Sequence, residues 1–116
     1  MRYAIAFALV LMPALAHARP PPGPPGKFSA WFRSLQIPGT SLSCCAEADC
    51  RPVSFRMRGG HYQAFIDSTH FPDGPNAWVS VPDSKILRDK PNPTGFAQAC
   101  WTRWGGVLCF VLPSLA

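Results

Sequence analysis

The five cysteines of this chain fall into two groups, and this distribution constrains the fold more than any other feature. Three lie close together as Cys44, Cys45 and Cys50, and two lie near the C-terminus as Cys100 and Cys109. In a small exported domain, such cysteines are interpreted first as a disulfide framework. The two groups therefore predict a cross-linked fold, provided that the chain is exported and its folded part is small.

Residues 1–18 have the three parts of a secretory signal peptide. Arg2 supplies a positive charge, residues 3–15 are apolar, and Ala16-His17-Ala18 is a small-x-small cleavage site. The apolar run is shorter than the roughly 20 residues that a bilayer span needs. An uncleaved anchor is the alternative. We expect an exported protein, periplasmic or secreted, with no membrane span after signal cleavage.

Residues 19–26 read Arg-Pro-Pro-Pro-Gly-Pro-Pro-Gly, which favours an extended, polyproline-like backbone because proline fixes φ and lacks an N–H donor. We interpret this run as a linker, and a ligand for a proline-binding groove is the alternative. Residues 27–116 then form a single domain. A core of that size is marginal without cross-links, which favours disulfides.

An alternating pattern predicts an antiparallel hairpin. Apolar and polar residues alternate over residues 53–58 and 61–66, and Gly59-Gly60 supplies the positive φ angles of a two-residue turn. This register pairs Arg58 with His61 and makes one face apolar. The opposite face carries Ser54, Arg56, Arg58, His61 and Gln63.

Three further segments complete the predicted fold. Residues 27–35 have the apolar spacing of one helix face, and residues 77–81 form a third strand. Residues 96–101 and 107–112 form a second hairpin with Trp104 at its exposed tip. We expect an α+β domain, mostly β, in which a short N-terminal helix packs on about five antiparallel strands. An SH3-like small barrel is one arrangement that this order allows.

The pairing of the cysteines stays open at this point. In the second hairpin Trp101 faces Leu108, and Cys100 faces Cys109 at about 4.5 to 5.5 Å between Cα atoms, which is within disulfide range. This register favours a Cys100–Cys109 bridge and a second bridge to Cys50 within the first group. The competing arrangement links the groups to each other, for example Cys50 to Cys100, and closes a longer loop.

The cysteine spacing argues against a metal or redox site. Cys-Cys-x4-Cys is neither the Cys-x-x-Cys of structural zinc sites nor that of thioredoxin-like sites. We therefore predict structural disulfides, no metal and no cofactor. A thiol- or metal-handling envelope protein that uses Cys44, Cys45 and Cys50 is the alternative. No nucleophile elbow or cysteine-protease signature is present, so we assign no catalytic residue and expect no enzyme.

The charge is mildly basic, with a formal net charge of +5. This balance does not have the footprint of a nucleic-acid-binding protein. A candidate patch for an anionic partner, such as an envelope glycan or a lipid headgroup, consists of Arg51, Arg56, Arg58 and His61. We expect a non-enzymatic binding or structural module whose partner is a protein or envelope component, and the sequence leaves its oligomeric state open.

Several pieces of the chain resemble a family of small exported cysteine-containing proteins of alphaproteobacteria. The matching pieces are 38–40, 43–51, 77–87, 92–95, 99–101 and 106–110, among which the Cys-Cys-x4-Cys pattern is the most specific. They extend over most of the chain after residue 18. The resemblance implies export and a common small fold. The family has no known activity, so no catalytic residue is transferred.

Overall fold

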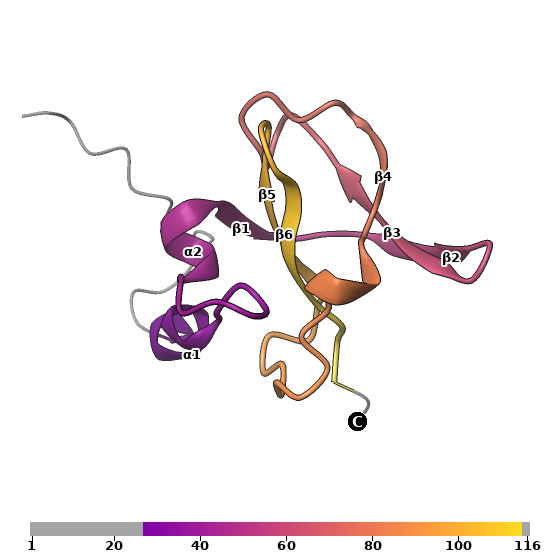
Figure 1. The fold of residues 1–116 in the computed structure, drawn as a ribbon. Helices are drawn as coiled ribbons and strands as arrows, with labels where there is room; N and C mark the ends of the chain where they lie inside the picture. Colours follow the sequence, from indigo (N-terminus) through magenta and orange to yellow (C-terminus); the bar gives the residue numbers. More distant parts are fainter. Residues whose placement is uncertain (1–26, 115–116) are drawn as a thin grey trace, which may run out of the picture.

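The structure is a computed structural model, and it describes residues 27–114 (Figure 1). The predicted signal peptide and the linker over residues 19–26 lie outside the described residues. The elements in chain order are α1 (Ser29–Ser34), α2 (Cys44–Glu47), β1 (Asp49–Pro52), β2 (Phe55–Arg58), β3 (His61–Ile66), β4 (Ala77–Ser80), the 3-10 helix η1 (Asp83–Lys85), β5 (Gln98–Thr102) and β6 (Gly106–Val111).

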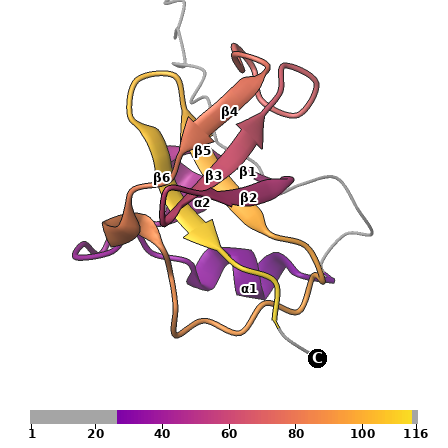
Figure 2. The ribbon, with the colours of Figure 1, turned by 90° about the vertical axis from the view of Figure 1, so that its right-hand side faces the viewer.

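The strands form two antiparallel sheets, with the orders β1-β5-β6 and β2-β3-β4. The chain passes from one sheet to the other between β1 and β2, where two backbone hydrogen bonds mark the change. Val53 N–H donates to Ala97 O in the first sheet, and Phe65 N–H donates to Ser54 O in the second. Figure 2 shows the strands of one sheet crossing those of the other.

The two sheets also meet near the end of β6. Ile86, which follows η1, pairs in parallel with Phe110, and Leu87 N–H donates to Phe110 O at 2.8 Å. This contact brings the chain after β4 against β6. The domain is therefore small and mostly β, as predicted, and its arrangement is compatible with an open sandwich or barrel.

The first hairpin confirms the predicted register. Arg58 lies opposite His61, and Phe55 lies opposite Ala64. Gly59 and Gly60 have φ values of 58° and 80°, which a two-residue turn of this kind requires. Local turn chemistry and alternation therefore specify this hairpin.

The second hairpin differs from the prediction by one residue. A bulge between Cys100 and Trp101 pairs Trp101 with Val107 instead of Leu108, and Thr102 pairs with Gly106. Gly106 has a φ of 69°, a left-handed conformation that suits a glycine at a bulged hairpin end. The strand register that places Cys100 opposite Cys109 is confirmed.

Buried residues form two clusters, and β5 and β6 lie between them. One cluster contains Phe32 and Leu35 beside α1, together with all five cysteines. The other fills the space between the sheets and includes Ile66, Phe71 and Phe110. Because neighbouring residues on a strand point to opposite faces, Cys109 enters the first cluster and Phe110 the second.

Replacing Phe110 by alanine is expected to lower the free energy of unfolding by about 3–5 kcal/mol. Its side chain is fully buried, and its ring centroid lies 5.9 Å from that of Tyr62 and 6.1 Å from that of Phe55. The matched control is Phe96→Ala, since Phe96 is 65% exposed and should change stability by no more than about 0.5 kcal/mol. Urea unfolding without reductant measures both values, and equal losses would contradict this placement.

Candidate functional site

Both disulfides link the first cysteine group to the second. Cys44 is bonded to Cys109, and Cys50 is bonded to Cys100. The predicted local pattern, with a Cys100–Cys109 bridge, is therefore wrong, and the competing arrangement that joins the two groups is correct. Cys45 is the free cysteine of the described chain.

The disulfides join the two groups because strand β1 pairs with strand β5. The prediction of local bridges did not include this strand pairing. This pairing places Cys50 opposite Cys100, with 4.0 Å between their Cα atoms. Helix α2 directly precedes β1, so Cys44 is brought within 6.2 Å of Cys109, measured between Cα atoms. Cys100 and Cys109 are cross-strand neighbours, but each sulfur bonds to a partner outside the hairpin.

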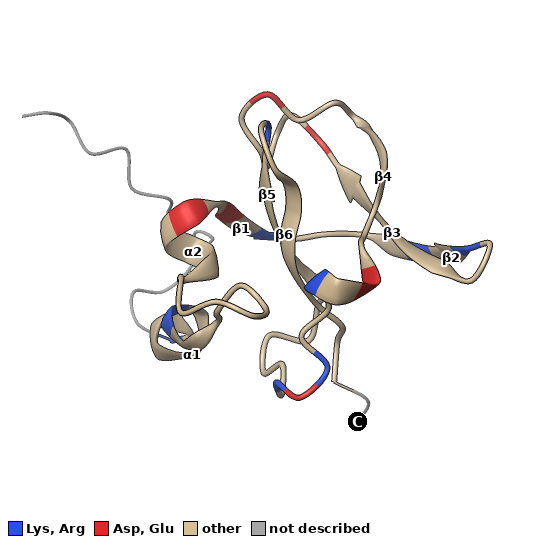
Figure 3. Cartoon of the chain, in the orientation of Figure 1, with Lys and Arg blue, Asp and Glu red and all other residues tan. Residues whose placement is uncertain are grey.

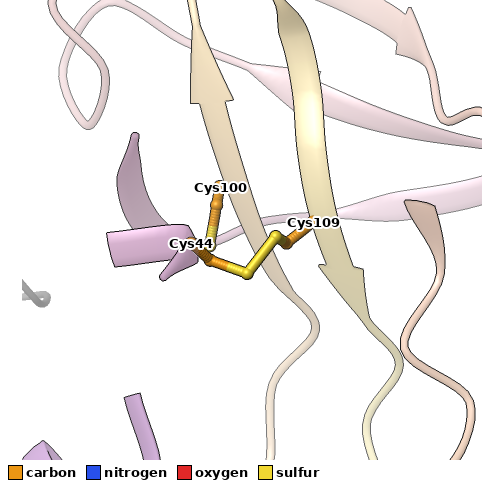
Figure 4. Close-up of side chains that lie close together, drawn as sticks. All are labelled: Cys44, Cys100 and Cys109. Carbon is orange, nitrogen blue, oxygen red and sulfur yellow. A yellow bond between two sulfur atoms is a disulfide. The ribbon is translucent and has the colours of Figure 1, made fainter. Parts of the chain in front are cut away.

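The five sulfurs form one buried cluster in which Cys100 is central. The sulfurs of Cys44, Cys100 and Cys109 lie within 4.8 Å of one another, and so do those of Cys45, Cys50 and Cys100. Figure 4 shows the Cys44–Cys109 bridge between α2 and β6, with Cys100 beside it. The Sγ atoms of Cys45 and Cys50 are only 2.9 Å apart.

The Cys45 thiol is held in its neutral form. Burial raises its pKa to about 11, against an opposing effect of the Arg51 charge and a smaller, reinforcing effect of Asp49. The side chain is only 7% exposed. Because the thiolate is both the nucleophile and the metal ligand, Cys45 has little reactivity toward solvent at neutral pH.

The cluster cannot offer three thiolates to a metal while both disulfides are intact. Each three-sulfur group includes at least two sulfurs that are already bonded within a disulfide. A form with three thiolates would therefore require prior reduction of at least the Cys50–Cys100 bridge, because Cys45 is the only sulfur of either group that is free.

The predicted arginine patch is divided between the two sheets. Arg56 and Arg58 lie on β2, whereas Arg51 lies on β1 and donates from Nη1 to the backbone oxygen of Cys50 at 2.8 Å. His61 lies across the hairpin from Arg58, with Nδ1 3.6 Å from Asp83 Oδ2. Figure 3 shows basic residues on β1 and on β2 at separate places.

Arg56 is engaged by its own sheet. Its Nε donates to Gln63 Oε1 at 2.8 Å, and its guanidinium lies 4.3 Å from the centroid of the Trp78 ring. Burial and then the charge of Arg58 lower the pKa of Arg56. An anionic partner for this hairpin stays a prediction.

A groove of about 500 Å³, which the sequence did not predict, lies between the end of α2, the loop before β4 and the tip of the β5–β6 hairpin. Three segments line it: Ala46–Asp49, which joins α2 to β1, Pro72–Asp73 in the loop before β4, and Trp101–Trp104 at the tip of the β5–β6 hairpin. Because these segments are far apart in the sequence, no local motif indicates the groove.

Trp104 is the most exposed large apolar side chain of the described residues, with 87% of its surface accessible. This confirms its predicted place at a hairpin tip. The Arg103 guanidinium lies 5.0 Å from the Trp104 ring centroid, and its Nη1 lies 3.8 Å from Asp73 Oδ2. Glu47 and Asp49 add two further carboxylates, and Figure 3 shows acidic residues on α2 and β1.

The exposed histidine of the loop after β3 stabilises a turn. His70 Nδ1 lies 2.8 Å and 2.9 Å from the two carboxylate oxygens of Asp67, and the His70 backbone N–H donates to Oδ1. Burial would raise the pKa of Asp67, but these hydrogen bonds and the His70 charge lower it. The pair thus has a structural explanation.

Comparisons of the chain with protein-family models, with curated proteins and with solved structures find no match. Within residues 27–114, no helix is both long enough and apolar enough to span a membrane. The resemblance to exported alphaproteobacterial proteins therefore stays a prediction.

Replacing Cys45 by alanine is expected to make stability less sensitive to alkaline pH. The folded protein keeps the thiol proton up to a pKa of about 11, whereas the unfolded chain releases it near the ordinary value of 9.0. Stability from this group is therefore complete below pH 9 and is lost as the pH rises toward 11. The wild type should lose about 1 kcal/mol more than Cys45→Ala between pH 8 and pH 10. Urea unfolding at both pH values measures this difference, and parallel losses would contradict the buried thiol.

Proposed function

We propose that this chain is an exported, non-enzymatic binding module in which the cysteines are structural. The observation that carries the proposal is the state of the sulfur cluster. Four sulfurs are used in disulfides between distant segments, and the fifth is a buried, protonated thiol. This chemistry stabilises a fold and gives Cys45 little reactivity toward molecules in solution.

The disulfides support export because cross-links of this kind persist in oxidising compartments. The bonded cysteines are separated by 65 and 50 positions in the sequence. Loops of that length correspond to about 4 kcal/mol each in the chain-entropy model, which is comparable with the whole stability of a small domain. The charged start, apolar run and cleavage site of residues 1–18 support the same compartment.

A binding role is supported by the exposed surface of the groove. An indole that is 87% exposed loses the stabilisation that burial would give, and aromatic side chains are enriched in interfaces. Trp104 has carboxylates nearby and a guanidinium at its ring, so the groove offers apolar area and charge together. These properties suit a surface that recognises a partner with both apolar and charged groups.

Thiol exchange is a second candidate function, and the 2.9 Å contact between Cys45 Sγ and Cys50 Sγ favours it. In this step the Cys45 thiolate attacks Cys50 Sγ, the Cys45–Cys50 bond forms, and the Cys50–Cys100 bond breaks. Cys100 leaves as a thiolate and takes up the proton that Cys45 released, so no external oxidant is needed. The high pKa of Cys45 opposes this step at neutral pH.

The sulfur state is tested by the intact mass of the exported protein, combined with alkylation and disulfide mapping. We expect a chain that begins at Arg19 and contains two disulfides. No alkylation is expected under native conditions at pH 7, and one alkylated thiol after denaturation without reductant. Cys45→Ser is the matched control, since it should give no alkylation in either condition and the same two bridges.

Other labelling patterns would overturn the proposal. Three or more free thiols, or a metal retained in the native mass spectrum, would show that the cysteines are not structural. A Cys45–Cys50 bridge with alkylated Cys100 would instead support the thiol-exchange function. A chain that retains residues 1–18 would contradict export by signal cleavage.

A further inference from the structure

Strand β2 lies at an edge of its sheet and directs part of its backbone outward. The sheet has the order β2-β3-β4, so β2 pairs with β3 alone. The Phe65 N–H donates to Ser54 O, and the oxygen of Tyr62 accepts a bond from the chain after β4. Because hydrogen-bonded and non-hydrogen-bonded pairs alternate along two antiparallel strands, Phe55 and Met57 direct their N–H and C=O groups away from β3.

The outward groups of β2 coincide with exposed apolar side chains. Within residues 27–114, no hydrogen bond reaches the outward N–H and C=O groups of Phe55 and Met57. Their side chains are 38% and 54% exposed, and the Phe55 ring is held by Tyr62 and Phe110, each at a centroid distance of 6.1 Å. Figure 1 shows the hairpin projecting on the side of the domain away from α1 and α2. The edge thus offers the backbone groups and apolar contacts that an added strand requires.

The polar face of the same strand is positively charged. Arg58 is exposed and forms no hydrogen bond or ion pair with the described residues. Arg56 is held in place because its Nε donates to Gln63, whereas its terminal Nη groups have no hydrogen-bond partner in the described chain. The nearby carboxylate of Asp83 lies 3.6 Å from His61 on β3. The edge therefore favours a strand that places carboxylates opposite the two arginines.

The arginines also argue against a second copy of β2 as the added strand. The antiparallel register that aligns Phe55 of one copy with Met57 of the other places Arg56 opposite Arg56. Like charges directly opposite each other destabilise a strand pair, and natural edge strands use charged side chains to prevent pairing between copies. A segment of opposite charge has no such penalty.

We propose that β2 is a second binding surface, which takes an extended segment of a partner protein as an added antiparallel strand. This segment alternates acidic and apolar residues. Its carboxylates lie opposite Arg56 and Arg58, and its apolar side chains lie opposite Phe55 and Met57. Backbone hydrogen bonds supply affinity, and the alternation selects the partner. This inference rests on the proposed binding role, but it uses neither the groove nor the cysteines.

The experiment uses a short, capped peptide of alternating glutamate and valine as the probe. Binding is followed in ¹H–¹⁵N NMR spectra of the chain that begins at Arg19, with both disulfides formed. We expect the largest shifts at the backbone amides of Phe55 and Met57. A peptide with lysine in place of glutamate should bind about tenfold more weakly, because attractive cross-strand pairs become repulsive.

Methylation of the peptide's backbone nitrogens tests strand addition directly. In the proposed register, the valines opposite Phe55 and Met57 exchange hydrogen bonds with β2, whereas the glutamate N–H groups point away from it. N-methylation of the valines should therefore abolish binding. N-methylation of the glutamates is the matched control and should preserve it.

Two variants of the protein test the charge of the edge. Arg56→Gln/Arg58→Gln should weaken binding of the glutamate peptide about fivefold and remove the preference over the lysine peptide. The matched control is Arg33→Gln/Arg88→Gln, which changes the net charge equally at exposed positions on α1 and after η1. It should change the affinity less than about twofold, because distant exposed charges are screened by salt.

Absence of binding by the glutamate peptide would overturn the inference, and so would equal binding of the lysine peptide or of the valine-methylated peptide. Shifts centred on Trp104 would place the peptide in the groove, and a dimer through β2 without peptide would make a second copy the occupant. Either result overturns the assignment. If β2 fails these tests while both disulfides and the cleaved chain are found, the proposed structural role of the cysteines is unaffected.

Discussion

The pairing of β1 with β5 is the interaction on which the rest of this structure depends. It sets Cys50 opposite Cys100, and it carries α2 to β6 so that Cys44 reaches Cys109. The cluster beside the helices contains all five cysteines together with apolar side chains such as Phe32, Leu35 and Ile37, so it is both packed and cross-linked. The cluster between the sheets contains no cysteine and relies on residues such as Phe71 and Phe110. Disulfides thus reinforce only one of the two clusters, and the other relies on packing alone.

The sequence predicts features with local causes and misses those that depend on distant contacts. Alternation and Gly59-Gly60 specify the first hairpin, because turn conformation and face pattern agree within a few residues. Strand β1 was missed because Asp49–Pro52 has only four residues, contains no β-branched or aromatic side chain and ends in proline. Proline is tolerated there since β1 is an edge strand. Without that strand, the register of Cys100 with Cys109 was correct, but the bridge inferred from it was wrong.

The same distinction explains what was predicted of the candidate sites. Exposure of Trp104 follows from its place at a hairpin tip, whereas Glu47 and Asp73 become its neighbours only through the fold. The arginine patch was inferred from alternation. Alternation predicts on which face of the hairpin Arg56 lies, but it cannot show that Gln63 and Trp78 contact its side chain. It also cannot show that Arg51 belongs to the other sheet.

The sulfur cluster and the groove are structurally connected, because two residues that line the groove are next in sequence to bonded cysteines. Asp49 precedes Cys50 on the acidic wall, and Trp101 follows Cys100 on the aromatic wall. The β1–β5 pairing sets Asp49 directly opposite Trp101, and the Cys50–Cys100 bond cross-links the next pair of residues along the same two strands. Exchange to a Cys45–Cys50 bridge would remove this cross-link and leave the backbone pairing alone to hold the two walls. The buried, protonated state of Cys45 opposes that exchange and so helps to keep the cross-link beside the groove.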